Sequence, residues 1–87
     1  MWSFKILVSR IEFAETLVNK IRDHFRVCFQ GPSLDHILLI AAALKNERLT
    51  PAEEQEIKNL LGELENESRI YKYHDRYCGE LYATTHA

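Results

Sequence analysis

The sequence predicts an all-α fold, a helical hairpin or small bundle with a long first helix, a short buried second helix and a long third helix. Three observations favour it. Residues 2–29 contain neither glycine nor proline, residues 37–44 form an unbroken apolar run, and Thr50-Pro51-Ala52-Glu53 has the form of a helix start. Because 87 residues make one domain at most, we expect a single helical domain over residues 1–87.

The first helix is expected over residues 3–29. Its apolar residues recur at intervals of three and four, which lines one face of an α-helix. They are Phe4, Leu7, Ile11, Ala14, Val18, Ile21, Phe25 and Cys28. The alternating pattern over residues 2–8 also fits a short strand. No later segment offers that strand a convincing partner, so we expect a helix from near Ser3.

The second helix is expected over residues 34–46. Gly31 and Pro32 end the first helix, because glycine readily adopts the left-handed conformation after a helix and proline blocks its continuation. Ser33 is a natural N-cap for the next one. The centre of this helix is apolar on every side, so we expect it to be sandwiched between its neighbours.

The third helix is expected over residues 51–82. Thr50 caps it, Pro51 occupies its first position, and Glu53 completes a capping box. An apolar stripe then continues at helical spacing to Leu81. The polar segment 65–68 interrupts the stripe without glycine or proline, which leaves a break near Asn66 as the alternative.

A homodimer is expected from the helix lengths. The second helix spans only ~20 Å and covers the C-terminal half of the first, so the N-terminal half stays bare. An unbroken third helix overshoots as well. Because exposed apolar overhangs are poorly tolerated in a monomer, we expect each copy to cover the overhang of the other.

Composition and charge restrict the class of protein. A formal net charge of −2 argues against general nucleic-acid binding, which needs a basic face. The charge is uneven: residues 1–30 carry five Lys/Arg against three Asp/Glu, whereas residues 50–68 carry six Glu against one Lys. No apolar run is long enough for a bilayer, and no secretion signal is present. We therefore expect a cytoplasmic protein with free thiols and no membrane contact.

Two His/Cys pairs are candidate metal ligands. His24 and Cys28 are four residues apart, as are His74 and Cys78, so each pair lies on one helical face. Together they supply the four ligands of a tetrahedral zinc site. An unbroken third helix separates the pairs by ~20 Å, so this site requires the break near Asn66 or a second subunit. The alternatives are that both cysteines are small core residues flanked by the histidines, or that they have a disulfide or redox role.

Enzymatic and DNA-binding functions have little support. The sequence has no glycine-rich phosphate loop, serine nucleophile motif or paired-carboxylate motif, so we expect no enzyme. The second and third helices resemble a helix–turn–helix unit in outline. Its recognition helix, however, begins with Glu53, Glu54 and Glu56, which repel phosphates.

The remaining signal is surface chemistry. Tyrosine and arginine are enriched in interfaces, and residues 69–82 hold four tyrosines and two arginines. The candidate partner-binding residues among them are Arg69, Tyr73, Arg76 and Tyr77. Glu53, Glu54 and Glu56 form a second candidate surface for a basic partner. We therefore expect a non-enzymatic protein–protein interaction module without a cofactor, a regulator, inhibitor or adaptor that works as a homodimer. A structural zinc module and a weak DNA-binding regulator are the alternatives.

Overall fold

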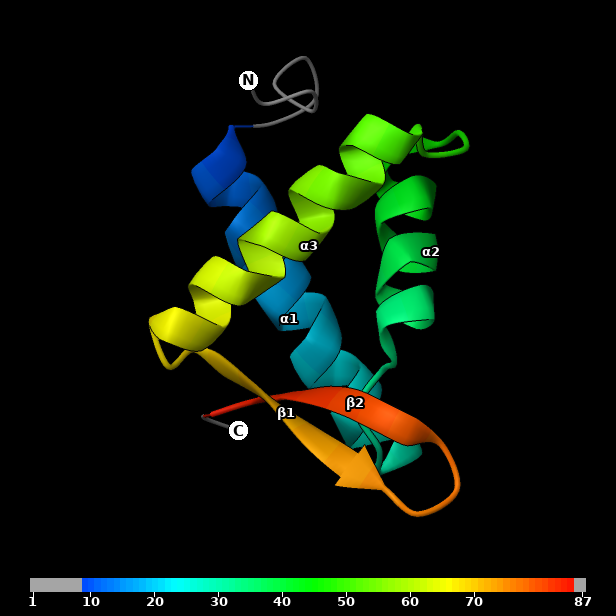
Figure 1. Ribbon diagram of the computed structural model, residues 1–87, viewed down its shortest axis with the longest axis vertical. Coiled ribbons are helices and arrows are strands. Elements are labelled where there is room, and N and C mark those ends of the chain that lie inside the picture. Colours follow the sequence, from blue (N-terminus) through cyan, green and yellow to red (C-terminus); the bar gives the residue numbers. More distant parts are fainter. Residues whose placement is uncertain (1–8, 86–87) are drawn as a thin grey trace.

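The computed structural model describes residues 9–85, which form three helices packed against a two-stranded antiparallel hairpin (Figure 1). In chain order the elements are α1 (Arg10–Cys28), α2 (Leu34–Lys45), α3 (Pro51–Asn66), β1 (Ile70–Asp75) and β2 (Gly79–Thr84). In Figure 1, α3 crosses α1, α2 lies to one side of both, and the hairpin closes the lower end. The prediction of an all-α bundle is therefore wrong, because the fold contains both helices and a sheet.

The helix α1 begins after Ser9. The Ser9 backbone is extended, and its hydroxyl accepts a hydrogen bond of 3.2 Å from the Glu12 N–H. The spacing of Ser9 and Glu12 is that of a capping box, a signal that the apolar periodicity obscured. The expected helical residues 3–8 and the strand alternative over 2–8 lie outside the described residues. At the other end Phe29, with φ 55°, takes the left-handed conformation expected of Gly31.

The predicted starts of α2 and α3 are confirmed. The Ser33 hydroxyl accepts a hydrogen bond from the His36 N–H, and Thr50 and Glu53 form a reciprocal capping box. The expected enclosure of α2 is wrong, however. Only Ile37 and Ala41 of this helix are buried, while Leu39 is 67% exposed, because α2 packs along one side of the other helices.

The predicted third helix ends early. α3 stops at Asn66, the position of the alternative break, and the chain then forms a hairpin in place of further helix. The Asp75 carboxylate accepts hydrogen bonds from the N–H groups of Tyr77 and Cys78, at 2.8 and 2.9 Å. Gly79 pairs with Asp75 and has φ 80°. These features belong to a three-residue hairpin loop closed by a left-handed glycine.

The hydrophobic core lies between the helices and the inner face of the hairpin. Its largest fully buried apolar side chains are Phe13, Leu17, Ile21, Ile37, Ile57, Leu61, Leu64 and Ile70. In β2, residues 81–83 are also buried. The apolar seam predicted for α1 is only partly buried, since Ile11 and Cys28 are exposed. Because α3 crosses the first half of α1, the bare overhang that motivated the homodimer is not found in residues 9–85.

No helix in the described part of the chain combines the length and the apolar character needed to cross a bilayer.

Candidate functional site

A groove runs along α1, between this helix and the segment formed by the end of α3, the following turn and the hairpin. It consists of three hollows of about 240, 330 and 250 Å³, called here the first, second and third hollows from the start of α1 to its end. Glu67 and Arg69 line both the first and the second hollow, and Arg22 and Thr85 line both the second and the third. The three hollows therefore adjoin one another along roughly 24 Å of α1, and this row of hollows is called the groove below.

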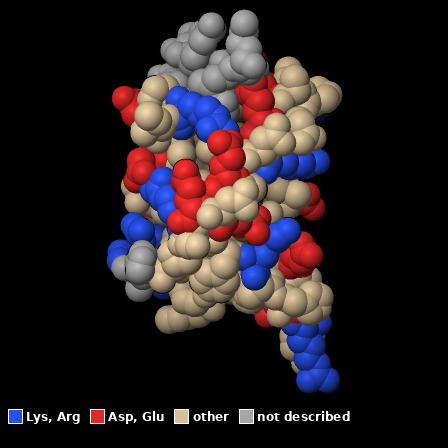
Figure 2. All heavy atoms as spheres, turned by 60° about the vertical axis from the view of Figure 1, so that its left-hand side comes forward, with Lys and Arg blue, Asp and Glu red and all other residues tan. Residues whose placement is uncertain are grey.

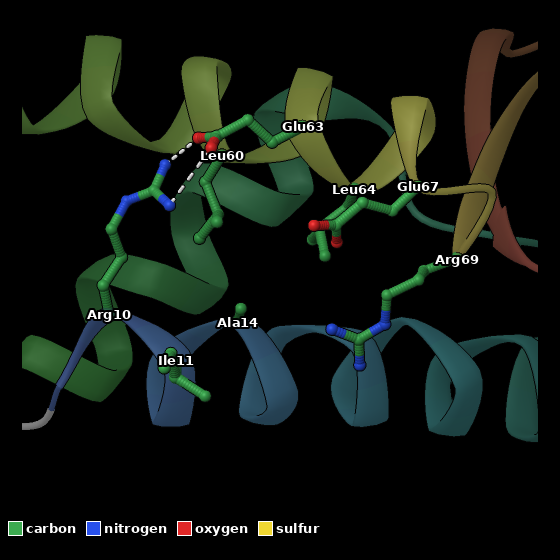
Figure 3. A pocket seen from close by; sticks show the side chains of 8 residues that line it. All are labelled: Arg10, Ile11, Ala14, Leu60, Glu63, Leu64, Glu67 and Arg69. Carbon is green, nitrogen blue, oxygen red and sulfur yellow. Dashed lines mark hydrogen bonds and ion pairs between the residues drawn. The ribbon is translucent and has the colours of Figure 1, made fainter.

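The first hollow lies between α1 and α3, and ion pairs span it. Figure 3 shows the Arg10 guanidinium reaching across to the Glu63 carboxylate, with which it forms two hydrogen bonds. Arg69, at the far end of this hollow, forms an ion pair with Glu15 of α1. These contacts tie α3 and the start of β1 to α1. The apolar residues that line the hollow are Ile11, Ala14, Leu60 and Leu64.

The third hollow has a different composition. Arg22 and Arg26, one helical turn apart on α1, line it together with Phe25, Tyr71 and residues 83–85. Phe25 and Tyr71 keep 43% and 47% of their surface exposed. Within the described part of the chain, no carboxylate lines this hollow, in contrast to the first one. It therefore combines two guanidinium groups with two partly exposed aromatic rings.

The charge distribution differs along this side of the molecule. In Figure 2, acidic and basic side chains lie next to one another over the upper part. The lower part, where Figure 1 places the hairpin, has fewer charged side chains over its centre, with basic and acidic side chains at its margins. The lower end is thus the less charged part of this face.

Two of the predicted zinc ligands lie near one another at this end. The side-chain amide of Gln30 donates a hydrogen bond of 3.3 Å to the Cys78 sulfur, and the backbone carbonyl oxygen of Gln30 lies 2.8 Å from His24 Nδ1. The His24 ring also packs edge-on against His36, with 4.6 Å between the ring centroids. Among residues 9–85, no group of three or more His, Cys, Asp or Glu side chains is arranged to hold a metal ion.

The other two predicted ligands, Cys28 and His74, are exposed on α1 and β1. Both cysteines are free thiols at the surface. The alternative interpretation of Cys28 and Cys78 as core residues is therefore wrong. Helical periodicity placed them on an apolar seam, but the seam is buried only as far as Ile21, and Cys78 belongs to a hairpin loop.

The predicted Tyr/Arg surface divides into structural and open parts. The Tyr73 hydroxyl accepts a hydrogen bond of 2.9 Å from the Gly31 N–H, and Arg69 is engaged by Glu15. Arg76 and Tyr77 lie in the hairpin loop, where Tyr77 is 87% exposed. The Arg76 guanidinium carbon lies 5.9 Å from the centroid of the Tyr77 ring. Only these last two residues form an open surface.

Glu53, the first residue of the predicted acidic surface, is not exposed to a partner. Glu53 is 4% exposed, and its carboxylate accepts hydrogen bonds from the Lys45 ammonium at 2.6 Å and from the Thr50 N–H at 2.9 Å. The hydrogen bond from Lys45, followed by that from the Thr50 backbone, lowers the pKa of Glu53 below its ordinary value of 4.5. Glu53 is therefore a structural residue. Glu54 and Glu56 are partly exposed.

The chain matches no protein-family model, no curated protein and no solved structure. The residues of the third hollow were not predicted to form one site. The sequence showed the spacing of Arg22 and Arg26, which places two cations on one side of a helix, and Tyr71 as one of the tyrosines near the C-terminus, but it gave no sign that they meet. The opposite wall, Tyr71 and residues 83–85, comes from the hairpin, where a helix was expected.

Proposed function

We propose that this chain is a non-catalytic protein-binding module, and that it binds a segment of another protein in the groove along α1. The observation that carries the proposal is the third hollow, where Phe25 and Tyr71 are partly exposed beside Arg22 and Arg26. Aromatic and arginine side chains contribute most of the energy of protein interfaces. The row of hollows follows roughly 24 Å of α1, the length of about seven residues of extended chain, and a bound segment would lie over the Arg10–Glu63 and Arg69–Glu15 ion pairs that cross it.

The lining of the groove supports binding better than catalysis. A nucleophilic site needs a nucleophile beside a base in a concave pocket. Among residues 9–85, neither histidine nor cysteine lines any of the three hollows, and the Glu63 carboxylate is engaged by Arg10. The chain would then act by binding a segment of its partner, as an inhibitor, regulator or adaptor does.

The hairpin loop is the second surface that fits the same function. Tyr77 presents nearly its whole ring to solvent, and Arg76 lies against it. This surface consists of two residues in the loop between β1 and β2, and neither lines any of the three hollows. We therefore favour the groove and use the loop as its internal comparison.

The test compares two tyrosines of the same hairpin. Peptides are first selected from a random library displayed on phage, with the wild-type chain as bait, and the affinity of the best peptide is measured by fluorescence anisotropy. Tyr71→Ala removes a ring that lines the third hollow, and Tyr77→Ala removes a ring from the loop. We expect Tyr71→Ala to weaken binding about tenfold or more and Tyr77→Ala to leave it within about twofold.

Circular dichroism confirms that both variants fold. If Tyr77→Ala weakens binding more than Tyr71→Ala does, the binding surface is the hairpin loop, and the proposal of a binding groove is wrong. The proposal is also wrong if neither substitution changes the affinity, or if the selection yields no binding peptide.

A further inference from the structure

We propose that the outer edge of β1 binds the partner's segment as a third strand of the sheet, an inference that rests on the proposed function and names the form of the bound segment. The segment would then be extended, and its backbone would pair with the hairpin while it lies along the groove. The observation that carries the proposal is a row of backbone N–H and C=O groups on β1 that have no hydrogen-bond partner among residues 9–85.

The register of the hairpin identifies these backbone groups. In an antiparallel pair, residues that exchange hydrogen bonds with the opposite strand alternate with residues whose N–H and C=O groups point outward. The Tyr82 N–H donates outward, to the Pro32 carbonyl at 2.9 Å, so Tyr82 and its pairing partner Lys72 belong to the outward set. His74, two residues further along β1, belongs to the same set.

The two edges of the hairpin differ in what covers them. The edge of β2 is occupied by the link between α1 and α2, through the hydrogen bond from Tyr82 to Pro32. Within residues 9–85, no comparable hydrogen bond joins the backbone of Lys72 or His74 to a segment outside the hairpin. In Figure 1 the second half of β1 lies at the lower margin of the molecule. An unpaired edge of this kind is a template for another extended chain.

The edge of β1 adjoins the groove through Tyr71, which lines the third hollow. Because side chains alternate along a strand, Tyr71 and Tyr73 share one face of β1, with 6.2 Å between their ring centroids. An added strand would continue this face, so every second side chain of the segment would lie beside the tyrosines. We expect apolar residues at those positions. Lys72 and His74 are exposed on the opposite face, so the intervening positions are expected to be polar.

A second copy of the chain fits this edge less well. In two β1 strands related by a two-fold axis, outward residues oppose outward residues. The two registers of greatest overlap then place Lys72 opposite Lys72 of the second copy, or opposite its His74. The first register sets like charges against each other, which destabilises a sheet, and neither offers Lys72 an acidic residue. A lysine on an edge strand is a common safeguard against self-pairing, and it leaves a segment of different sequence free to bind.

Methylation of the peptide backbone tests the proposed pairing. The best peptide selected against the wild-type chain is synthesised with one N-methyl group at each position in turn, and each affinity is measured by fluorescence anisotropy. A strand paired along one edge donates only every second N–H to β1. We expect methylation at those positions to weaken binding about tenfold or more, and methylation at the intervening positions to weaken it less than about threefold.

A matched pair of variants tests the same edge on the protein. Lys72→Pro removes the side chain and the N–H, whereas Lys72→Ala removes the side chain alone, and both break the 4.0 Å contact with Glu80. Because this N–H points outward, the proline removes no hydrogen bond of the hairpin. We expect Lys72→Pro to weaken binding about tenfold more than Lys72→Ala does.

Hydrogen exchange of the wild-type chain replaces this comparison if Lys72→Pro does not fold. The Lys72 and His74 amides should exchange at least about tenfold more slowly when the protein is saturated with the peptide, because pairing protects them from water. The Tyr82 amide, which already donates to Pro32, is the internal comparison and should change little.

The opposite outcomes separate the two proposals. Affinities that do not alternate along the peptide overturn strand pairing, as do Lys72 and His74 amides that exchange equally fast with and without it, and the groove survives if Tyr71→Ala still weakens the peptide. Alternating affinities with a Tyr71→Ala variant that binds like wild type keep the edge and overturn the groove. A dimer of the wild-type chain in sedimentation equilibrium that Lys72→Pro dissociates would show that the third strand comes from a second copy, which overturns a separate partner.

Discussion

Gly31 lies directly against the backbone of Tyr82: a Cβ atom added to Gly31 would lie 1.7 Å from the Tyr82 carbonyl oxygen. The neighbouring hydrogen bonds explain the close approach. The Tyr82 N–H donates to the Pro32 carbonyl at 2.9 Å, and the Gly31 N–H donates to the Tyr73 hydroxyl at the same distance. The link between α1 and α2 thus holds the hairpin in place. One wall of the third hollow depends on this contact.

Replacing Gly31 by alanine should therefore destabilise the fold. The methyl group has no space unless the backbone of β2 moves, so we expect Gly31→Ala to lower the free energy of unfolding by about 3 kcal/mol. Gly62→Ala is the matched control, because nothing lies within 4 Å of a Cβ there and the residue is inside α3. It should raise stability by about 0.5–1 kcal/mol. Urea unfolding measures both, and equal stabilities would contradict the account.

The stability of the fold should depend on the ionisation of Glu53. Its pKa is lowered in the folded state, chiefly by Lys45, so the ionised form stabilises the fold above the ordinary value of 4.5. That contribution is lost as the pH falls through the lower pKa of the folded protein. Glu53→Gln should therefore be less stable than wild type at pH 7, by about 1–3 kcal/mol, and the difference should shrink below pH 4.5. Urea unfolding at several pH values checks this, and a constant difference would count against it.

The hairpin loop should be sensitive to the residue at its end. Gly79 has φ 80°, a conformation that side chains with a Cβ atom rarely adopt. Gly79→Ala should lower the free energy of unfolding by about 1–2 kcal/mol, although nothing lies within 4 Å of the added atom. The effect would come from the backbone and not from a clash. Unchanged stability in urea unfolding would mean that the loop is not closed in this way.

The start of α1 gives a fourth prediction. The Ser9 hydroxyl accepts the Glu12 N–H, so Ser9→Ala should cost about 1 kcal/mol of stability. Ser9→Asp keeps an acceptor at the N-cap and should behave like wild type. Thermal unfolding followed by circular dichroism measures both variants. An alanine variant as stable as the aspartate variant would place the helix start elsewhere.

The helix starts could be predicted because capping is local. Ser33, Thr50, Pro51 and Glu53 act within one turn of their own positions, so the residues themselves carry the signal. The hairpin was missed because Tyr71, His74 and Leu81 fit a helical spacing, even though aromatic and β-branched residues in 70–73 also favour a strand. The spacing of Asp75 and Gly79 was the local clue to the loop.

The groove could not be predicted from the sequence for a different reason. Arg22 and Thr85 are far apart in the chain, and they share a hollow only because the hairpin folds back onto α1. An unbroken third helix in place of the hairpin would carry the tyrosines near the C-terminus away from the arginines of α1. The error in secondary structure therefore hid the site as well.

The most direct test of the central claim is to locate the bound peptide on the chain. The ¹H–¹⁵N correlation spectrum of the labelled protein is recorded with and without the best selected peptide. The groove predicts the largest shifts at the amides of Val18, Arg22, Phe25, Tyr71 and Thr85, and small ones at Tyr77. Shifts confined to the hairpin loop, or to the exposed face of α2 around Leu39, would contradict the claim that the groove is the binding surface.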